Sequence, residues 1–457
     1  MPLRVINPYD QSIYRELPFE SQAALQEKIV AARTAFDRWR RVPLGERIVA
    51  VRRGLDYFRD HQEAIATDIT RQMGKPLREA RNEIGGFFER AEYMLAIAEQ
   101  TLAPEVLPPR DGLHRRIERE PLGLVLDIAA WNYPLLIAVN VVVPALVAGN
   151  AVLLKHSAKT PLCGEYFQKA FDHLSGLMTN LVLTHDQTLD LIRDPRIDHV
   201  VFTGSVNGGQ HVHHAAADRF IDVGLELGGK DPAYVAEDAD LAYSVPGVVE
   251  GALYNGGQSC CAIERVYVHR RIYDAFIEQA LGALAHYAPG DPMDPATTLG
   301  PLADPKALAV LEGQVQDAVG RGARLLAGGK RPEGMPGNFY LPTLLADVDN
   351  DATVMQEESF GPLLPVRAVV DDEEALALMN ASRYGLTASV WTRSRERAEW
   401  FAARLEAGTV YQNRCDYLDP GLPWTGVKDS GRGSSLSRYG YYALTRPKSI
   451  NFRDGVA

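Results

Sequence analysis

The sequence has few cysteines and no signal-peptide core. It contains four cysteines in 457 residues, and two of them, Cys260 and Cys261, are adjacent. So few cysteines exclude a disulfide-stabilised scaffold and favour a reducing, cytoplasmic environment. The first residues, Met1 to Arg4, lack an apolar signal-peptide segment, which agrees with a cytoplasmic location.

Blocks of positive charge and long apolar runs are also missing. The 48 Lys and Arg residues are outnumbered by 59 Asp and Glu, which gives a net charge of −11. We therefore expect no nucleic acid partner. The longest apolar run, at 134–149, is interrupted by Asn140 and Pro144 and is too short to span a bilayer, so we also expect no membrane partner.

The length and the apolar pattern predict an α/β protein. At ~150 residues per domain, the chain is long enough for about three domains. Short apolar segments alternate with helical segments between 124 and 217, which is typical of a parallel sheet. We expect strands at 124–130, 151–154, 181–183 and 199–202. Parallel sheets bind ligands at the carboxyl ends of their strands.

A second α/β region is predicted after about residue 230. We expect strands at 265–269 and 409–412, and helices at 272–286 and 307–321. Between the N-terminal helices and the first strand, residues 101–121 contain the turn dipeptide Asp111–Gly112, which predicts a hairpin arm. The tail at 434–452 could pair with a partner.

Two motifs contain groups that suit nucleophilic and base catalysis. In the first, Gly257-Gln258-Ser259-Cys260, glycine allows the backbone close to a ligand and a thiol follows. In the second, Glu226 ends an apolar strand, where burial would raise its pKa and suit it to act as a general base. Taken singly, these could be a buried cysteine pair and an ordinary carboxylate at a strand end.

Three further motifs place ligand-binding groups after strands or in turns. Asn132, before Tyr133 and Pro134, offers an amide that could stabilise an oxyanion. Gly204–Ser205 precedes a helix, where backbone N–H groups could bind phosphate. A fifth motif, Glu357-Glu358-Ser359-Phe360, combines a carboxylate for ribose hydroxyls with an aromatic ring. Each of these could also be an ordinary turn.

The five motifs in this order resemble the aldehyde dehydrogenase superfamily, and the resemblance covers nearly the whole chain. Glu226 and Cys260 are 34 positions apart, which fits the interval in that family. The resemblance implies that Cys260 is the nucleophile, Glu226 the general base, and Asn132 the oxyanion-binding amide, helped by the Cys260 backbone N–H.

The resemblance also implies a cofactor, NAD or NADP, and a small-molecule aldehyde as substrate. The residues that would bind the cofactor are Lys155, Ser157, Ala158, Gly204, Ser205, Glu358 and Phe360. The residues that would form the substrate pocket are Tyr133, Ile137, Asn140, Cys261 and Leu418. We expect no metal, because no carboxylate or cysteine cluster completes a site with His211 and His214.

The implied fold has a Rossmann-type cofactor domain, an α/β catalytic domain and a small oligomerisation element. By resemblance, these comprise residues 1–100 and 122–228, residues 229–434, and residues 101–121 and 435–457. A homodimer or homotetramer is expected.

Two positions depart from common patterns in the family. Ala158 stands where many NAD-preferring members have a glutamate, which favours tolerance of the 2′-phosphate of NADP. Several segments are similar to succinate-semialdehyde dehydrogenases, yet Asn140 stands where one such group has an arginine for the substrate carboxylate. Arg414 could substitute for it, although a solvated or structural arginine is the simpler interpretation.

Four functions therefore stay open at this point. The first is oxidation of an aldehyde to a carboxylic acid through a cysteine thiohemiacetal and thioester. The second is a succinate-semialdehyde or other semialdehyde dehydrogenase. The third is a CoA-acylating relative, which Glu226 disfavours because such relatives often lack the base. The fourth is a catalytically silent structural homologue, which the intact Cys260, Glu226 and Asn132 oppose.

Overall fold

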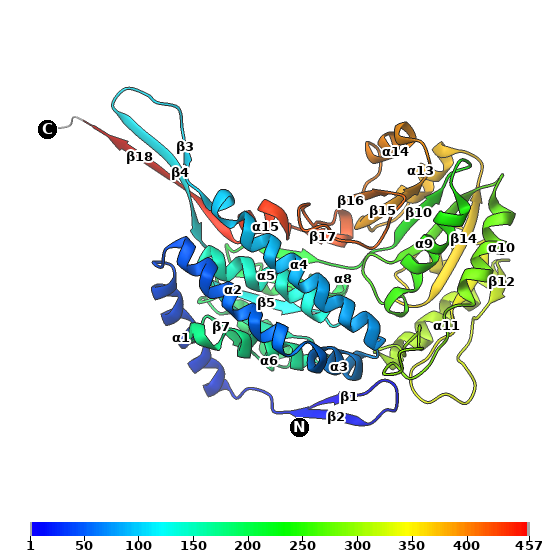
Figure 1. The fold of residues 1–457 in the computed structure, drawn as a ribbon, viewed down its shortest axis with the longest axis horizontal. Helices are drawn as coiled ribbons and strands as arrows, with labels where there is room; N and C mark the ends of the chain where they lie inside the picture. Colours follow the sequence, from blue (N-terminus) through cyan, green and yellow to red (C-terminus); the bar gives the residue numbers. More distant parts are fainter. Residues whose placement is uncertain (1, 455–457) are drawn as a thin grey trace.

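In the computed structural model, which describes residues 2–454, two parallel-stranded sheets lie in separate halves of the molecule (Figure 1). The six-stranded sheet has the order β17-β9-β8-β5-β6-β7. Its strands are β5 (Leu124–Ala129), β6 (Ala151–His156), β7 (Met178–Asn180), β8 (His199–Thr203), β9 (Val223–Glu226) and β17 (Gly431–Arg432). All neighbours are parallel except β17, which runs antiparallel to β9.

One predicted strand of this sheet is displaced along the chain. We expected a strand at 181–183, but the strand is Met178–Asn180. Met178 pairs with Val152 of β6, and the Leu181 N–H still donates to the Leu154 carbonyl at 2.8 Å. The expected segment was therefore wrong by about one strand length, because the pairing register with β6 rather than the apolar run decides where β7 lies.

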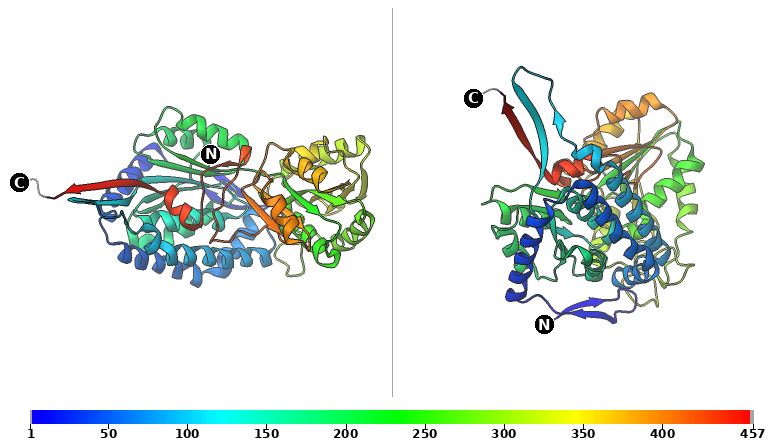
Figure 2. Two further views of the ribbon diagram at one scale, coloured as in Figure 1. Left: turned by 90° about the horizontal axis from the view of Figure 1, so that it is seen from above. Right: turned by 60° about the vertical axis from the view of Figure 1, so that its left-hand side comes forward.

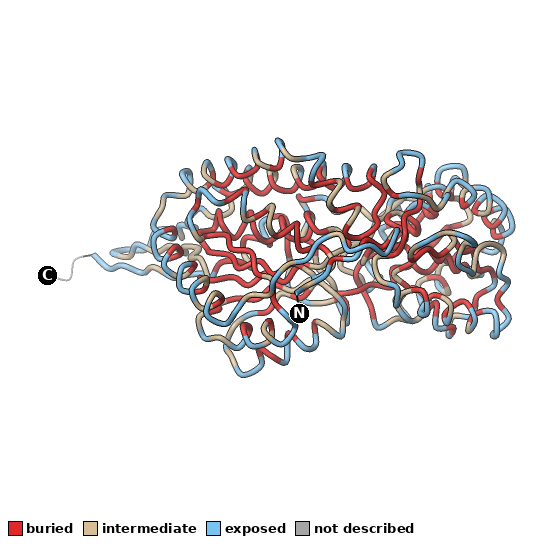
Figure 3. The backbone as a smooth tube through the Cα atoms, turned by 90° about the horizontal axis from the view of Figure 1, so that it is seen from below, coloured by how far each residue is buried: buried red, intermediate tan, exposed pale blue. Residues whose placement is uncertain are grey.

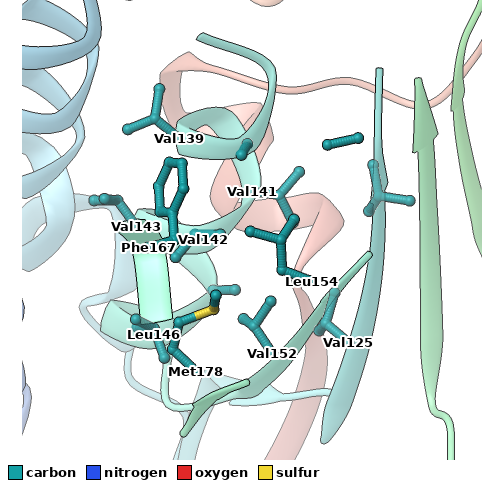
Figure 4. Packing of buried hydrophobic residues seen from close by; sticks show 14 of the residues in the cluster. Val125, Val139, Val141, Val142, Val143, Leu146, Val152, Leu154, Phe167 and Met178 are labelled. Atoms are coloured by element: carbon teal, nitrogen blue, oxygen red, sulfur yellow. The ribbon is translucent and has the colours of Figure 1, made fainter. Parts of the chain in front are cut away.

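Helices cover this sheet and the N-terminal region. They are α1 (Gln22–Trp39), α2 (Leu44–Asp60), α3 (Gln62–Met73), α4 (Leu77–Leu102), α5 (Pro134–Ala148), α6 (Pro161–Ala170), α7 (His185–Arg193) and α8 (Val206–Ala216), with a 3₁₀ turn at Asp172–Leu174. Helix α5 starts at Pro134, and the residue after its last turn, Gly149, has a left-handed backbone with φ 102°. A proline at the start and a glycine after the end are common at helix termini. Its apolar side chains pack with β5, β6, β7 and α6 (Figure 4).

The seven-stranded sheet has the order β12-β13-β14-β11-β10-β15-β16. Its strands are β10 (Asp231–Val235), β11 (Ile263–His269), β12 (Arg324–Ala327), β13 (Thr343–Ala346), β14 (Leu363–Val369), β15 (Thr387–Trp391) and β16 (Thr409–Gln412). Its helices are α9 (Leu241–Leu253), α10 (Tyr273–Leu284), α11 (Pro305–Gly320), α12 (Thr353–Gln356), α13 (Asp372–Asn380) and α14 (Arg395–Ala402), with 3₁₀ turns at Tyr254–Gly257 and Lys428–Ser430.

A narrow sheet projects from the body as an arm (Figures 1 and 2). It consists of β3 (Glu105–Val106), β4 (Leu113–Pro121) and β18 (Thr445–Arg453), and β18 pairs with β4 along its whole length. The tail therefore pairs with β4 of its own chain and forms one edge of this sheet. The preceding helix α15 (Ser437–Ala443) packs on the body, because the Tyr441 hydroxyl donates to the Met94 carbonyl at 2.8 Å.

The remaining element is an N-terminal hairpin of β1 (Leu3–Ile6) and β2 (Ile13–Leu17). Buried residues concentrate around the two sheets, whereas the strands of the arm contain one buried residue, Thr445 (Figure 3). Within residues 2–454, no helix is both long and apolar enough to cross a membrane. In the same range, no group of three His, Cys, Asp or Glu side chains is placed to hold a metal ion.

Candidate active site

Four predicted site residues or turns lie at one edge of the six-stranded sheet. Asn132 follows β5, Lys155 is near the end of β6, Gly204–Ser205 follows β8, and Glu226 ends β9. Because these strands are parallel, their carboxyl ends meet at the same edge. The chain runs from β5 to β6 on one side and returns to β8 on the other side of β5. Such a change of direction is where open α/β sheets bind ligands.

A cavity of about 760 Å³ lies next to this edge, between the two halves. Asn132, Glu226 and Cys260 all line it, so the structure brings together three residues that are far apart in the sequence. The five predicted pocket residues also line it: Tyr133, Ile137, Asn140, Cys261 and Leu418. The volume is within the range of small-molecule sites.

Cys260 follows a turn at residues 255–257 whose backbone is in the left-handed conformation. Asn255, Gly256 and Gly257 have φ angles of 55°, 64° and 73°. A Cβ atom at Gly257 would lie 2.3 Å from the Gly361 carbonyl oxygen, so only glycine fits there. The Asn255 side chain donates to the carbonyls of Asn132, at 3.2 Å, and Gln258, at 3.0 Å. Asn255 therefore connects the segment that contains Cys260 to the segment that contains Asn132, and its hydrogen bond to the Gln258 carbonyl stabilises the turn in which it lies.

The Asn132 side chain is available to a ligand. The residue is only 4% exposed, and its carbonyl is occupied by Asn255. Its side-chain amide makes no hydrogen bond to any residue between 2 and 454, yet it is not enclosed by protein. A neutral N–H donor directed into a small cavity is the group that stabilises a developing alkoxide.

Glu226 is held in an environment that favours its protonated form. Burial raises its pKa, while a hydrogen bond from the Ser435 hydroxyl and the charge of Arg90 act in the opposite direction. A carboxyl whose pKa lies nearer to neutrality can accept a proton from water more effectively than one on the surface.

Replacement of Ser435 with alanine should shift the pH profile. Loss of the donated hydrogen bond destabilises the Glu226 carboxylate, so its pKa rises further. The acidic limb of the steady-state rate against pH should move to higher pH, while the rate on the alkaline plateau changes little. Ser434→Ala, one residue away and without a side-chain hydrogen bond in the described chain, should leave the profile in place. An unshifted limb in Ser435→Ala would show that this bond does not tune the base.

Lys155 is the buried cation expected to contact the cofactor. It is 6% exposed, forms no ion pair within residues 2–454, and burial lowers its pKa to about 8. Ser157 and Ala158 form the turn that follows, and Ala158 is exposed. The neighbouring Lys159 is already occupied, because its amine lies 3.0 Å from the Asp304 carboxylate.

Gly204 and Ser205 form the turn into α8. The Gly204 N–H donates to the Glu226 carbonyl at 3.0 Å, which ties this turn to the strand that bears the predicted base. The Ser205 hydroxyl accepts from the Gly208 N–H at 3.1 Å and caps the helix. Other N–H groups of the first turn point out of the helix end, where they can bind phosphate oxygens.

Glu358 and Phe360 come from the other half of the molecule. Glu358 accepts from the Gly229 N–H at 3.1 Å, and burial together with nearby Glu264 raises its pKa to about 8. Phe360 has φ 50°, an uncommon conformation for a bulky residue that points to a functional position. Its ring packs edge-on against the Trp131 ring, with a distance of 5.5 Å between the two ring centroids.

The seven predicted cofactor residues lie outside the 760 Å³ cavity, along the same sheet edge and across from it. They offer a buried amine, a helix N-terminus, a carboxylate and an aromatic ring. These are the groups that ribose hydroxyls, a pyrophosphate and a nicotinamide ring require. The residues present therefore fit a nicotinamide dinucleotide.

Two residues of the cavity wall, Asp416 and Arg90, were not predicted from the sequence as site residues. Asp416 accepts from the Cys261 thiol at 2.9 Å and the Ser259 hydroxyl at 3.1 Å, and burial raises its pKa to about 6. Arg90 is buried on α4. A signal for Arg90 was present, because it shares the buried stripe of α4 with Phe87 and Met94, where a charged residue is unusual.

Residues 1–450 match the family model of the aldehyde dehydrogenase family. The chain belongs to the aldehyde dehydrogenase family. It is 37% identical to an NADP-dependent succinate-semialdehyde dehydrogenase of Deinococcus radiodurans over 98% of this chain and 94% of the relative. A Mycobacterium leprae enzyme of the same name is 33% identical, over 98% and 99%.

Solved structures agree with this assignment. An NADP-dependent enzyme of E. coli matches with a TM-score of 0.96 at 30% identity, over 99% of this chain and 95% of the other. Betaine aldehyde dehydrogenase from Staphylococcus aureus, solved with NAD⁺, matches with a TM-score of 0.94 at 29% identity, over 99% and 91%. The predicted family and fold class are therefore confirmed. The protein is an oxidoreductase that oxidises aldehydes with NAD or NADP.

Proposed function

We propose that this aldehyde dehydrogenase oxidises succinate semialdehyde to the dicarboxylic acid, that NADP is its preferred cofactor, and that Cys260, Asn132 and Glu226 perform the chemistry. This assignment is supported by the convergence of the three residues on one cavity, in which the Asn132 side-chain amide has no hydrogen-bond partner among residues 2–454. The succinate-semialdehyde dehydrogenases among its relatives support the substrate.

In the proposed mechanism, the Cys260 sulfur attacks the aldehyde carbon. The negative charge that develops on the oxygen is stabilised by the Asn132 amide and the Cys260 backbone N–H. When bound, the nicotinamide cofactor supplies the acceptor for the hydride that leaves this carbon. The acyl group then remains on Cys260 as a thioester. Glu226 takes a proton from the water that attacks the thioester, the carbon–sulfur bond breaks, and the acid leaves while the Cys260 thiolate is regenerated.

NADP is preferred in this proposal because no carboxylate follows Lys155 at the turn that faces the ribose. Ala158 is exposed and neutral, so a 2′-phosphate meets no repulsion there. Lys155 brings a positive charge that is unpaired within residues 2–454. The names of the relatives in Deinococcus radiodurans and Mycobacterium leprae agree with NADP.

Replacement of Ala158 with glutamate should reverse this preference. A carboxylate at the turn would repel the 2′-phosphate, so kcat/KM for NADP should fall at least about tenfold, while kcat/KM for NAD stays the same or rises. The neutral variant Ala158→Gln controls for side-chain size. Equal losses with both cofactors in Ala158→Glu would show that the turn does not face the 2′ position.

The assignment is tested by absorbance at 340 nm with a panel of aldehydes, with and without CoA. We expect NADPH formation with succinate semialdehyde to be independent of CoA. Strict dependence on CoA would instead identify an acylating enzyme. Absence of NADPH or NADH formation with any aldehyde would identify a silent homologue.

We further propose the domain division given above, with the arm of β3, β4 and β18 as an oligomerisation element. Val106 is 76% exposed and Phe452 is 58% exposed on this arm, as expected for a surface that another subunit covers. A homodimer or homotetramer follows from this proposal. The four cysteines are free thiols, which supports a reducing, cytoplasmic location.

A further inference from the structure

The wall of the 760 Å³ cavity contains a buried arginine that forms no ion pair in the described part of the chain. Arg90 lies on α4 and is 7% exposed. Its Nη1 donates to the Leu136 carbonyl at 3.1 Å and to the Asn140 side-chain oxygen at 3.2 Å. Within residues 2–454 it forms no ion pair with any aspartate or glutamate. Its Nε and Nη2 have no hydrogen-bond partner there, yet they are not enclosed by protein.

A buried positive charge without a partner is costly, so the site requires an explanation. Within residues 2–454, no acidic side chain of the cavity wall forms an ion pair with Arg90, and those named next contact other groups. Glu226, on which the Arg90 charge acts, accepts from the Ser435 hydroxyl. Glu83 pairs with Lys75 at 2.5 Å, and Glu89 accepts from the Tyr417 hydroxyl at 2.6 Å. Asp416 accepts from Ser259 and Cys261, as described above.

The two contacts that Arg90 does make orient it toward the cavity. Both go through Nη1 to α5, which leaves the Nε and Nη2 edge of the guanidinium group free. Two N–H groups on one edge match the two oxygens of a carboxylate. Burial lowers the pKa of Arg90, and the nearby Cys261 and Glu226 act in the opposite direction.

We propose that Arg90 binds the distal carboxylate of the substrate and so determines that this enzyme prefers aldehydes with an acid group at the other end. In this arrangement Asn140 acts as a positioning residue, because its side-chain oxygen holds the guanidinium group. The inference rests on the proposed function and adds to it the residue that recognises the substrate.

Arg414, the other arginine of the wall, is the alternative that the sequence suggested. It is exposed and its guanidinium carbon lies 3.6 Å from the centre of the Tyr417 ring. Its charge is therefore screened by water and already engaged with an aromatic face. Arg414 accordingly serves as the matched control.

The test compares kcat/KM for succinate semialdehyde and for butanal, which has the same chain length without the acid group. Both rates are measured on the alkaline plateau, where loss of the Arg90 charge no longer changes the ionisation of Glu226. In Arg90→Gln, we expect kcat/KM for succinate semialdehyde to fall about 100-fold or more, and the loss for butanal to be at least about tenfold smaller. In Arg414→Gln, both should stay within about threefold. Equal losses for both substrates in Arg90→Gln, or selective loss in Arg414→Gln, would overturn the assignment.

A second measurement does not depend on turnover. In the wild-type enzyme, succinate should slow the alkylation of Cys260 by iodoacetamide, followed by mass spectrometry, because it occupies the cavity. This protection should be lost in Arg90→Gln and weakened in Arg90→Lys, which keeps the charge without the paired donors and covers the case in which Arg90→Gln does not fold. Absence of protection by succinate in the wild type would contradict the proposal.

The two proposals fail in different ways. Wild-type enzyme that oxidises other aldehydes but not succinate semialdehyde would refute the proposed substrate. Wild-type enzyme that oxidises succinate semialdehyde, but with the same kcat/KM as butanal, would refute the role of Arg90 alone.

Discussion

Replacement of Cys260 with alanine should lower kcat with succinate semialdehyde by about 10⁴-fold or more, because no covalent intermediate can form without the sulfur. The free aldehyde carbon is trigonal, so without the sulfur there is no tetrahedral thiohemiacetal alkoxide for the Asn132 amide to stabilise in the proposed mechanism. The pre-steady-state burst of NADPH should disappear together with steady-state turnover. Stopped-flow absorbance at 340 nm measures both.

Cys163→Ala is the matched control for this variant. Cys163 lies fully buried on α6, away from the cavity, so the change should leave kcat within about twofold and cost about 1 kcal/mol of unfolding free energy. The variant Cys261→Ala tests whether the adjacent thiol is the nucleophile instead. If Cys261→Ala abolished the burst and Cys260→Ala preserved it, the nucleophile would be the thiol that hydrogen-bonds to Asp416.

The central parts of the site could be predicted because local chemistry determines them. Glu226 and Asn132 stand where apolar strands of a parallel sheet end, and Gly257 precedes Cys260 because no other residue fits beside the Gly361 carbonyl. Each of these requirements gives a recognisable motif of a few consecutive residues. The helices at 272–286 and 307–321 were predictable for the same reason, and the structure places them at Tyr273–Leu284 and Pro305–Gly320.

Other features depend on contacts between distant segments. The hydrogen bond from Ser435 to Glu226 joins residues 209 positions apart, and Arg90 meets Asn140 across 50 positions. Neither contact has a local sequence pattern. The pairing of β18 with β4 was missed for a related reason, since an exposed strand pattern predicts a β-edge but does not say which strand covers it.

Replacement of Glu226 with glutamine should separate the two halves of the reaction. Attack by Cys260 and hydride loss do not need the Glu226 carboxylate, so the first turnover should still give a burst of NADPH. Hydrolysis of the thioester loses its base, so the steady-state rate should fall by about 10²- to 10³-fold. The acylated enzyme should accumulate and be detectable by mass spectrometry at Cys260.

The steady-state rate of the wild type should also depend on the ionisation of Glu226. In the wild type, burial raises the pKa of Glu226, and only the carboxylate form can accept a proton. The steady-state rate should therefore rise as the pH increases through this pKa, and Glu226→Gln should lack that acidic limb while keeping its burst at every pH. A Glu226→Gln enzyme that released acid at the wild-type rate, or that lost its burst along with its turnover, would require a different base.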